Sequence, residues 1–297
     1  MQERQLMTER RNRATENLDT VSALEIVKIM NREDAEVPRA IRRVLPEIAK
    51  AVDLIAARLA KGGRLIYVGS GTSGRIGALD ASECQPTFGV DAQTVQFLLA
   101  GGERALVRAA EASEDSPELG RSDIAARKPG KRDVVVGIAA SGFTPYTIAA
   151  IEYAASKGAG TVGIACNRGS ALGKTADIAI EVEVGPEVLT GSSRLKAGTA
   201  AKLICNMLTT GAMARLGYVY SNMMVRMHLK NRKVLERGIT ILESLMHIDR
   251  EQASETLEGA GMSVALALVM LKTNASKAQA ARRLRKARGN VRKAIEG

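Results

Sequence analysis

The sequence has no tryptophan and is poor in aromatic residues, histidine and cysteine. Aromatic residues make up 3% of the 297 residues, and the chain has two histidines and three cysteines. A packed core must therefore be built from Ala, Val, Ile, Leu and Met. Cys84, Cys166 and Cys205 are odd in number and form no C-x-x-C motif, so we expect reduced thiols rather than a disulfide framework. His228 and His247 lie far from every cysteine in the sequence, so zinc-site spacing is absent and we predict no metal.

Long apolar stretches are also lacking. The longest, Met262–Leu271, is too short to span a bilayer. The amino-terminal segment "MQERQLMTERRNRATENLD" is polar and has none of the apolar core that secretion signals contain. We therefore predict a cytoplasmic protein that does not enter a membrane.

Positive charge is in excess and is concentrated near the carboxyl end. The net charge is +11, and the stretch from Lys272 to Gly297 holds nine Lys or Arg residues and one acid. Such a stretch is either the solvated face of a helix or a nucleic-acid-binding surface. A surface for single strands would interleave aromatic residues with the basic ones, and this stretch does not. We expect a solvated helix and no nucleic-acid partner.

Short runs rich in β-branched residues predict a parallel sheet of five strands. These runs are Arg64–Ser70, Thr94–Ala100, Asp133–Ala139, Gly160–Cys166 and Ile178–Val184. The first, third and fourth are almost continuously apolar, as strands buried on both faces are. Helix-length segments such as Glu103–Ala112 and Pro145–Lys157 separate the strands, which is typical of β-α-β units. The predicted fold class is therefore α/β, with a doubly wound parallel sheet.

Helical patterns flank the predicted sheet on both sides. The segment that starts at Val37 has helical periodicity and ends on Gly62-Gly63, and residues 196–297 are predicted to be helical throughout. Breaks are expected at "REDAEVP" and "HIDREQAS". The predicted organisation is a helical arm over 1–44, an α/β domain over 45–220 and a small helical module over 240–297.

Three segments rich in glycine and hydroxyl groups follow predicted strands, and each precedes a helix. They read "GSGTSG", "AASGFTPYT" and "GPEVLTGSSRLKAGT". Glycines let a ligand approach the backbone, and the start of a helix offers free N–H groups, so such segments favour a bound anion, most simply a phosphate. The candidate contacts are Ser70, Thr72, Ser73, Ser141 and Thr144, with Glu187, Ser192, Ser193, Arg194 and Lys196 as a second group.

Two nucleotide-binding motifs are similar to these glycine-rich segments but fit them less well. "GSGTSG" matches G-x-G-x-x-G, but a dinucleotide site also needs an acid at the end of the second strand, where the chain reads "FLLAGG". "GSALGKT" is one residue short of a P-loop. A third interpretation is that "GSGTSG" is only a flexible turn without a ligand. Similar segments at the same end of the predicted sheet argue against it. We therefore predict that these segments bind a phosphate group of a small ligand, and we expect no cofactor.

Longer motifs resemble a known family. "GSGTSGR" and "ASG-x-TPY" are similar to sugar isomerase (SIS) domains. "RLIYVGSGTSGRIGALDASECQPTFG", "EASEDS", "DVVVGIAASGFTPY" and "GPEVLTGSSRLKAGTAAK" closely resemble N-acetylmuramic acid 6-phosphate etherases. The last block also resembles glucokinase regulatory proteins, which are non-catalytic sensors with two SIS domains. The resemblance implies a homodimer that cleaves the D-lactyl ether of this sugar phosphate in peptidoglycan amino-sugar recycling.

Two carboxylates are candidates for the catalytic acid and base. Glu83 lies in the loop-like "ASECQPT", and Glu114 lies in "EASEDS", with Asp115 as a rival. Elimination across C2 and C3 of the opened sugar needs a base and an acid, and the residues alone do not say which carboxyl is which. The resemblance implies that Glu83 is the proton donor and Glu114 the base. A non-catalytic sugar-phosphate sensor and a phosphosugar isomerase remain the alternative functions.

Overall fold

The computed structural model describes residues 6–108 and 111–297, so the first five residues of the predicted arm lie outside the described residues. The chain divides into two compact units. The sheet unit comprises Met1–Ser82 and Gln93–Thr209, and the helical unit comprises Glu83–Ala92 and Thr210–Gly297. Each unit is described by itself.

The sheet unit is built on five parallel strands, in the order β2-β1-β3-β4-β5. They are β1 (Leu65–Gly69), β2 (Val95–Leu99), β3 (Val134–Ile138), β4 (Gly160–Ala165) and β5 (Ile178–Glu181). Every residue of β1, β3 and β4 is buried, as their continuous apolar runs predict. The five predicted strands and the parallel α/β fold are confirmed.

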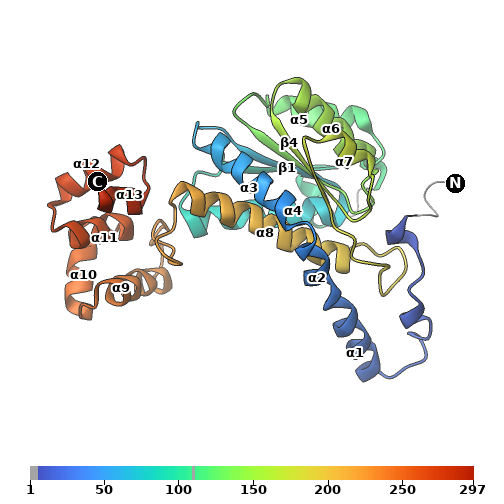
Figure 1. Ribbon diagram of the computed structural model, residues 1–297, viewed down its shortest axis with the longest axis horizontal. Coiled ribbons are helices and arrows are strands. Elements are labelled where there is room, and N and C mark those ends of the chain that lie inside the picture. Colours follow the sequence, from blue (N-terminus) through green and yellow to red (C-terminus); the bar gives the residue numbers. More distant parts are fainter. Residues whose placement is uncertain (1–5, 109–110) are drawn as a thin grey trace. The chain divides into compact units, whose positions relative to one another are not determined.

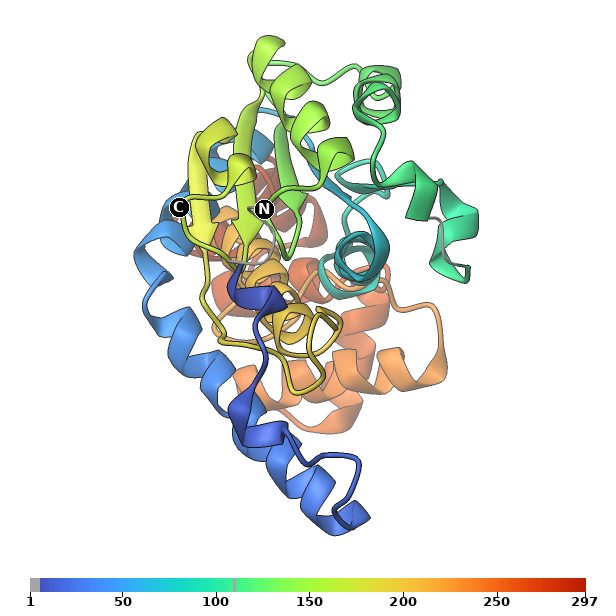
Figure 2. The same cartoon turned by 90° about the vertical axis from the view of Figure 1, so that its right-hand side faces the viewer.

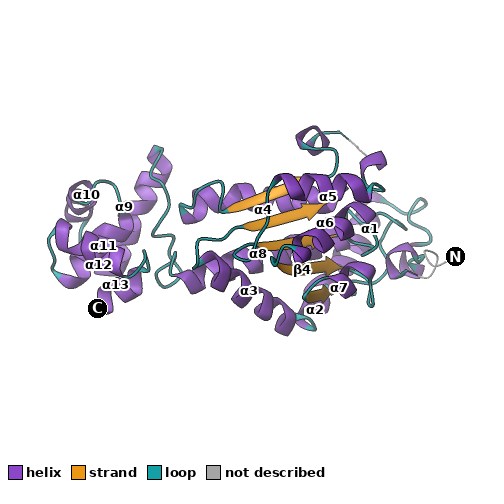
Figure 3. Ribbon diagram, turned by 90° about the horizontal axis from the view of Figure 1, so that it is seen from above, coloured by secondary structure: helices purple, strands orange, loops and turns teal. Residues whose placement is uncertain are grey.

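Helices cover both faces of this sheet (Figures 1 and 3). On one face, Ile66, Val68 and Val135 share a core cluster with Tyr146 and Ile151. This face carries α5 (Pro117–Ala126), α6 (Pro145–Ser156) and α7 (Ala171–Thr175). On the other face α3 (Leu45–Leu59) packs against β3 and β5, and Tyr67 bonds to Asp80 of α4 (Gly71–Phe88) and to a carbonyl of α8 (Lys196–Leu216). The doubly wound arrangement is thus confirmed.

The connection after β2 differs from the prediction. A helix over Glu103–Ala112 was expected, but the described residues form two short 3-10 helices, η4 (Glu103–Leu106) and η5 (Glu111–Ser113), and residues 109–110 lie outside the described part of the chain. Gly101 and Gly102, directly before η4, take positive φ of 85° and 71°. The carbonyls of Ala105 and Leu106 accept from the Arg75 guanidinium instead of from a following helical turn.

The amino-terminal arm begins with η2 (Met7–Glu9) and η3 (Arg13–Thr15) and continues into α1 (Ala23–Asp34) and α2 (Glu36–Arg42). The helix is interrupted at Ala35, between α1 and α2, as expected from "REDAEVP". Figure 2 shows the arm (blue) running beside the loop (yellow) that follows β5. The arm is therefore part of the sheet unit.

The helical unit has its own apolar core, which includes Leu242, Leu257 and Leu268. Its helices are α9 (Arg232–Met246), α10 (Arg250–Gly259), α11 (Val264–Thr273), α12 (Lys277–Lys286) and α13 (Val291–Glu296). The break at "HIDREQAS" is confirmed, because Asp249 caps α10. The prediction of continuous helix was wrong between α8 and α9. Gly217, at φ 81°, lies just beyond α8, and Asn231 caps α9.

The three cysteines are buried and unbridged. No single helix in the described part of the chain is long and apolar enough to cross a membrane, and the one pair that passes together, α10 with α11, is bent by 109°.

Candidate active site

The winding of the sheet reverses between β1 and β3. These strands are neighbours, but the chain passes from β1 outward to β2 before returning to β3. Ligands of open parallel sheets bind at the carboxyl ends of the strands where the winding reverses in this way. The segments that leave β1 and β3 here are the two hydroxyl-rich turns "GSGTSG" and "SGFT".

The turn after β1 depends on close backbone approach. A Cβ atom at Gly74 would stand 2.6 Å from the carbonyl oxygen of Gly69, and one at Gly69 would stand 2.8 Å from the nitrogen of Gly74. Gly71 takes φ of 52° and starts α4. These positions admit only glycine without a shift of the backbone, and they bring Ser70, Thr72 and Ser73 to the start of the helix.

Glu114 joins both turns. Its carboxylate accepts a hydrogen bond from Ser70 Oγ at 3.0 Å and another from Thr144 Oγ1 at 3.3 Å. Its carbonyl oxygen accepts from the backbone N–H of Tyr146 at 3.1 Å, which fixes η5 to the start of α6. Three residues predicted from separate parts of the sequence, namely Ser70, Glu114 and Thr144, thus meet at the switch point.

Ser141 lies in the same turn as Thr144. Its Oγ accepts from the backbone N–H of Phe143 at 3.1 Å, and this leaves its own O–H available as a donor. Thr72 lies close to the start of α8, because a Cβ added at Gly198 would stand 3.4 Å from Thr72 Cγ2. Ser73 is half-buried in the first turn of α4.

Sequence reasoning missed Asn167, which supports the turn after β3. Its side-chain amide donates to the carbonyl oxygen of Ser141 at 3.0 Å and to Thr8 Oγ1 at 3.2 Å, and its oxygen accepts from the N–H of Met7 at 2.7 Å. Asn167 is 4% exposed and follows the apolar end of β4. A polar residue directly after a buried strand was the signal that could have revealed it.

The third predicted segment is organised around its own carboxylate. Glu187 is fully buried, and its two oxygens accept from the N–H groups of Lys196 and Ala197 at 2.9 Å each. This carboxylate occupies the place at the start of α8 where we expected a ligand anion. Burial, with a smaller effect from Asp34, raises the pKa of Glu187 despite these hydrogen bonds.

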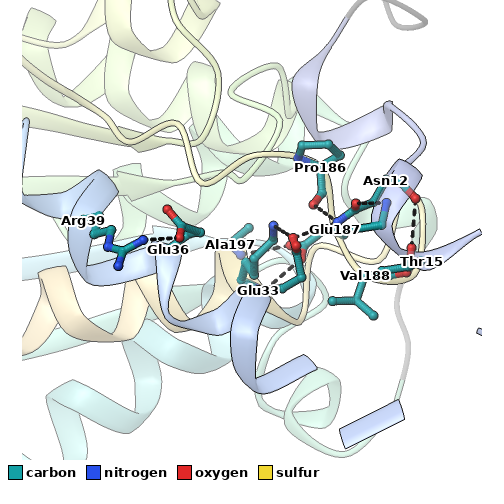
Figure 4. A network of polar contacts seen from close by, with 11 residues as sticks. Asn12, Thr15, Glu33, Glu36, Arg39, Pro186, Glu187, Val188 and Ala197 are labelled. Carbon is teal, nitrogen blue, oxygen red and sulfur yellow. Dashed lines mark hydrogen bonds and ion pairs between the residues drawn. The ribbon is translucent and has the colours of Figure 1, made fainter. Parts of the chain in front are cut away.

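Lys196 is 1% exposed and points to the amino-terminal arm. Its Nζ lies 2.8 Å from Glu33 Oε2, and Asn12 Nδ2 donates to the same oxygen at 2.7 Å (Figure 4). Burial alone would raise the pKa of Glu33, but Lys196 and Asn12 together hold it below its ordinary value. The charged groups of Glu187 and Lys196 therefore face partners within the protein.

The remaining predicted residues lie in the loop before α8. Ser192 and Ser193 are half-buried, and the carbonyl oxygen of Ser193 accepts from the N–H of Gly198 at 3.0 Å. Arg194 is exposed. Gly198, which bonds to this loop, lies next to Thr72. None of the contacts among the described residues joins Arg194 to Glu114.

Glu83 belongs to the helical unit. The prediction of a loop around Glu83 was wrong, because α4 continues to Phe88 and contains Pro86 in its last turn. A proline there costs only one hydrogen bond near the helix end. The Glu83 side chain is exposed and lines a cavity of 320 Å³ together with His228, Lys230 and Arg237.

Comparison with known proteins decides the family. Residues 47–155 match the model of the glucokinase regulatory protein N-terminal SIS domain, and residues 127–211 match the SIS domain model. The chain is 48% identical to the N-acetylmuramic acid 6-phosphate etherase of Clostridium beijerinckii over 98% of this chain and 96% of that one. The Oenococcus oeni enzyme of the same name is 50% identical, over 98% of each chain. The chain belongs to the N-acetylmuramic acid 6-phosphate etherase family.

Solved structures support the fold of this etherase-family chain. A putative phosphosugar isomerase from Bacteroides fragilis aligns with a TM-score of 0.54 at 20% identity, covering 70% of this chain and 98% of that one. A phosphoheptose isomerase from Francisella tularensis aligns at 0.50 and 17% identity, covering 64% of this chain and all of that one. At this identity the likeness concerns the SIS fold alone.

Proposed function

We propose that this protein cleaves the D-lactyl ether of N-acetylmuramic acid 6-phosphate, yielding N-acetylglucosamine 6-phosphate and D-lactate. The observation that carries the proposal is the near full-length identity to etherases, joined to a carboxylate held at the switch point between two hydroxyl-rich turns. The reaction would serve the recycling of peptidoglycan amino sugars in the cytoplasm, with the protein acting as a homodimer.

The chemistry of the bond favours elimination. An alkyl ether resists direct attack by water at neutral pH. In the ring-opened sugar, however, the C2 proton is acidic because it neighbours the aldehyde. A base removes this proton, an acid protonates the ether oxygen at C3, and lactate leaves. Water then adds to C3 of the unsaturated aldehyde, and C2 regains a proton.

We assign Glu114 as the base and Glu83 as the acid, as the family resemblance implies. The surroundings of Glu114 support the first assignment, because two hydroxyl donors hold its oxygens in place while the side chain stays partly exposed. A base must be held in a fixed position within reach of the proton that it removes. Glu83 is exposed in a cavity and accessible to a substrate oxygen.

The candidate hydroxyl groups fall into two classes, those that already donate a hydrogen bond within the protein and those that can donate one to a ligand. The hydroxyl groups of Ser70 and Thr144 donate hydrogen bonds to Glu114, so toward a ligand they can act only as acceptors. They suit a ligand group that donates, such as a sugar hydroxyl or an amide N–H. Ser141 keeps its O–H for donation, and Thr72 and Ser73 lie at the positive end of α4. We propose that these three contact the phosphate.

Replacing Ser141 by alanine tests this division. We expect the KM for the phosphorylated sugar to rise roughly tenfold, because a hydrogen bond to a charged group is lost. Ser156→Ala is the matched control, since the Ser156 hydroxyl lies at the far end of α6 and donates to the carbonyl oxygen of Tyr153. An equal loss with substrate lacking the 6-phosphate would contradict the assignment.

The sensor alternative draws on the match to the glucokinase regulatory protein domain model. One assay separates the three functions. The purified protein is given N-acetylmuramic acid 6-phosphate, and free D-lactate is measured with a coupled dehydrogenase. Lactate release supports the etherase. Binding without turnover would indicate a sensor, and a rearranged sugar with its lactyl group intact would indicate an isomerase. Sedimentation of the same sample tests the homodimer.

A further inference from the structure

The turn after β3 contains three consecutive carbonyl groups, and each accepts a hydrogen bond from the segment that follows β4. The carbonyl oxygen of Ala140 accepts from the N–H of Cys166, and that of Gly142 accepts from the N–H of Leu172, at 2.9 Å each. A carbonyl oxygen carries partial negative charge and repels an anion unless a donor occupies it. These two backbone bonds therefore suit a turn that binds a phosphate.

The middle carbonyl group, that of Ser141, is held by a side chain instead of the backbone. Asn167 Nδ2 donates to its oxygen at 3.0 Å. Asn167 is 4% exposed, so water cannot easily take the place of its amide. The position of Ser141, whose hydroxyl group is a proposed phosphate contact, thus depends on the orientation of the Asn167 amide.

The amino-terminal arm fixes that orientation. The N–H of Met7 donates to Asn167 Oδ1 at 2.7 Å, and Thr8 Oγ1 accepts from Asn167 Nδ2 at 3.2 Å. A backbone N–H can only donate, so Met7 binds the oxygen side of the amide and leaves the nitrogen side to face Ser141. We call the segment Met7–Thr15 the strap. Its residue Thr8 is 2% exposed, so this contact is shielded from water.

The other end of the strap is bound to the loop after β5. Asn12 Nδ2 donates to the carbonyl oxygen of Pro186 at 3.3 Å, and Thr15 Oγ1 donates to that of Val188 at 2.9 Å (Figure 4). Asn12 and Thr15 are both buried. The strap is therefore anchored at two places, and all of these residues belong to the sheet unit.

We infer that Asn167 and the strap are positioning elements that hold the Ser141 hydroxyl in place for the phosphate of the ligand. The inference rests on the proposed function, which makes that ligand a 6-phosphosugar. The side chain of Asn167 acts through Ser141 and need not touch the ligand. The bonds to Glu114 come from Ser70, Thr144 and Tyr146, so loss of the Asn167 amide should weaken binding more than it slows the chemical step.

Asn167→Ala tests the inference through binding of N-acetylglucosamine 6-phosphate, measured by titration calorimetry. We expect the dissociation constant to rise roughly tenfold, the effect of losing one hydrogen bond to a charged group. In a protein that already carries Ser141→Ala, the same substitution should add less than about twofold, because the contact that it positions is gone. N-acetylglucosamine, which has no phosphate, should bind the variant and the unmodified protein alike.

Asn206→Ala is the matched control. The Asn206 side chain is half-buried in the same unit and donates to Asp80 Oδ1 at 2.7 Å, a contact between α8 and α4 outside the turn. This variant should be less stable but should bind the phosphosugar as the unmodified protein does.

Thr8→Val is the second variant, and it decides the matter if Asn167→Ala does not fold. It removes one partner of the Asn167 amide and should weaken binding roughly threefold. Thr8→Ser keeps the hydroxyl group and should bind as the unmodified protein does.

Equal dissociation constants for Asn167→Ala and Asn206→Ala would overturn the inference, and so would fully additive losses in the double variant with Ser141→Ala. It would also be overturned if the unmodified protein bound the phosphosugar no more tightly than N-acetylglucosamine. These binding measurements need no turnover. Failure of the unmodified protein to release lactate would therefore refute the proposed function alone, and the positioning role would still be decided by the dissociation constants.

Discussion

Replacing Glu114 by glutamine should lower the rate of lactate release by about 10²–10⁴, which is the usual contribution of a general base. Glutamine has the shape of the carboxylate and can still accept from Ser70 or bond to Thr144, so the turns should keep their places. Because the base starts the reaction, exchange of the C2 proton with solvent should be lost to the same extent. Both rates are measured on one sample, by lactate assay and by NMR in heavy water.

Asp115→Asn is the matched control for this variant, since Asp115 is the exposed neighbour of Glu114 and should retain full activity. Glu83→Gln provides the contrast. It should also lose lactate release, but it should keep C2 exchange because the base survives. If exchange persists in Glu114→Gln and vanishes in Glu83→Gln, the two roles are swapped. Nearly normal turnover by Glu114→Gln would rule it out as the base.

Replacing Lys196 by methionine should destabilise the folded protein by about 3 kcal/mol. Removing one partner of a buried ion pair typically costs about 3–5 kcal/mol, and the lower value applies because the Glu33 side chain keeps 17% of its surface exposed. The Lys196 side chain is 2% exposed, so water cannot easily replace its contacts. The midpoint of urea unfolding, followed by circular dichroism, measures the effect.

Lys28→Met is the matched control for Lys196→Met. Lys28 also pairs with a glutamate, Glu25, at 2.9 Å, but its side chain is 58% exposed. Exposed pairs contribute about 0–1 kcal/mol, so this variant should unfold almost as the unmodified protein does. Equal midpoints for the two variants would show that the contact between the arm and α8 does not stabilise the fold.

Local patterns in the sequence predicted the elements of the sheet unit well. The β-branched runs and the glycine-rich turns are short-range signals, and each matches a strand or the turn that follows it. Ser70 and Thr144 follow β1 and β3, so their approach follows from the general rule about the carboxyl ends of parallel strands. Glu114 was chosen with the help of the family resemblance, and it bonds to both of them.

Long-range features could not be predicted in this way. The strand order is one such feature, because each run of residues fits any position in a parallel sheet. The bond between Lys196 and Glu33 joins residues 163 positions apart. The sequence also does not distinguish a buried lysine from an exposed one. Glu83 was placed in a loop because Pro86 follows it, although a helix tolerates proline in its last turn when packing favours the helix.

The most direct test of the elimination mechanism is the fate of oxygen and hydrogen from labelled water. The protein is allowed to cleave N-acetylmuramic acid 6-phosphate in ¹⁸O-labelled heavy water, and both products are analysed by mass spectrometry and NMR. Elimination followed by water addition predicts ¹⁸O in the C3 hydroxyl of the sugar, deuterium at C2, and no ¹⁸O in the hydroxyl of lactate. Label in the lactate hydroxyl, with C2 still carrying its original proton, would mean direct displacement at the lactyl carbon and would contradict elimination.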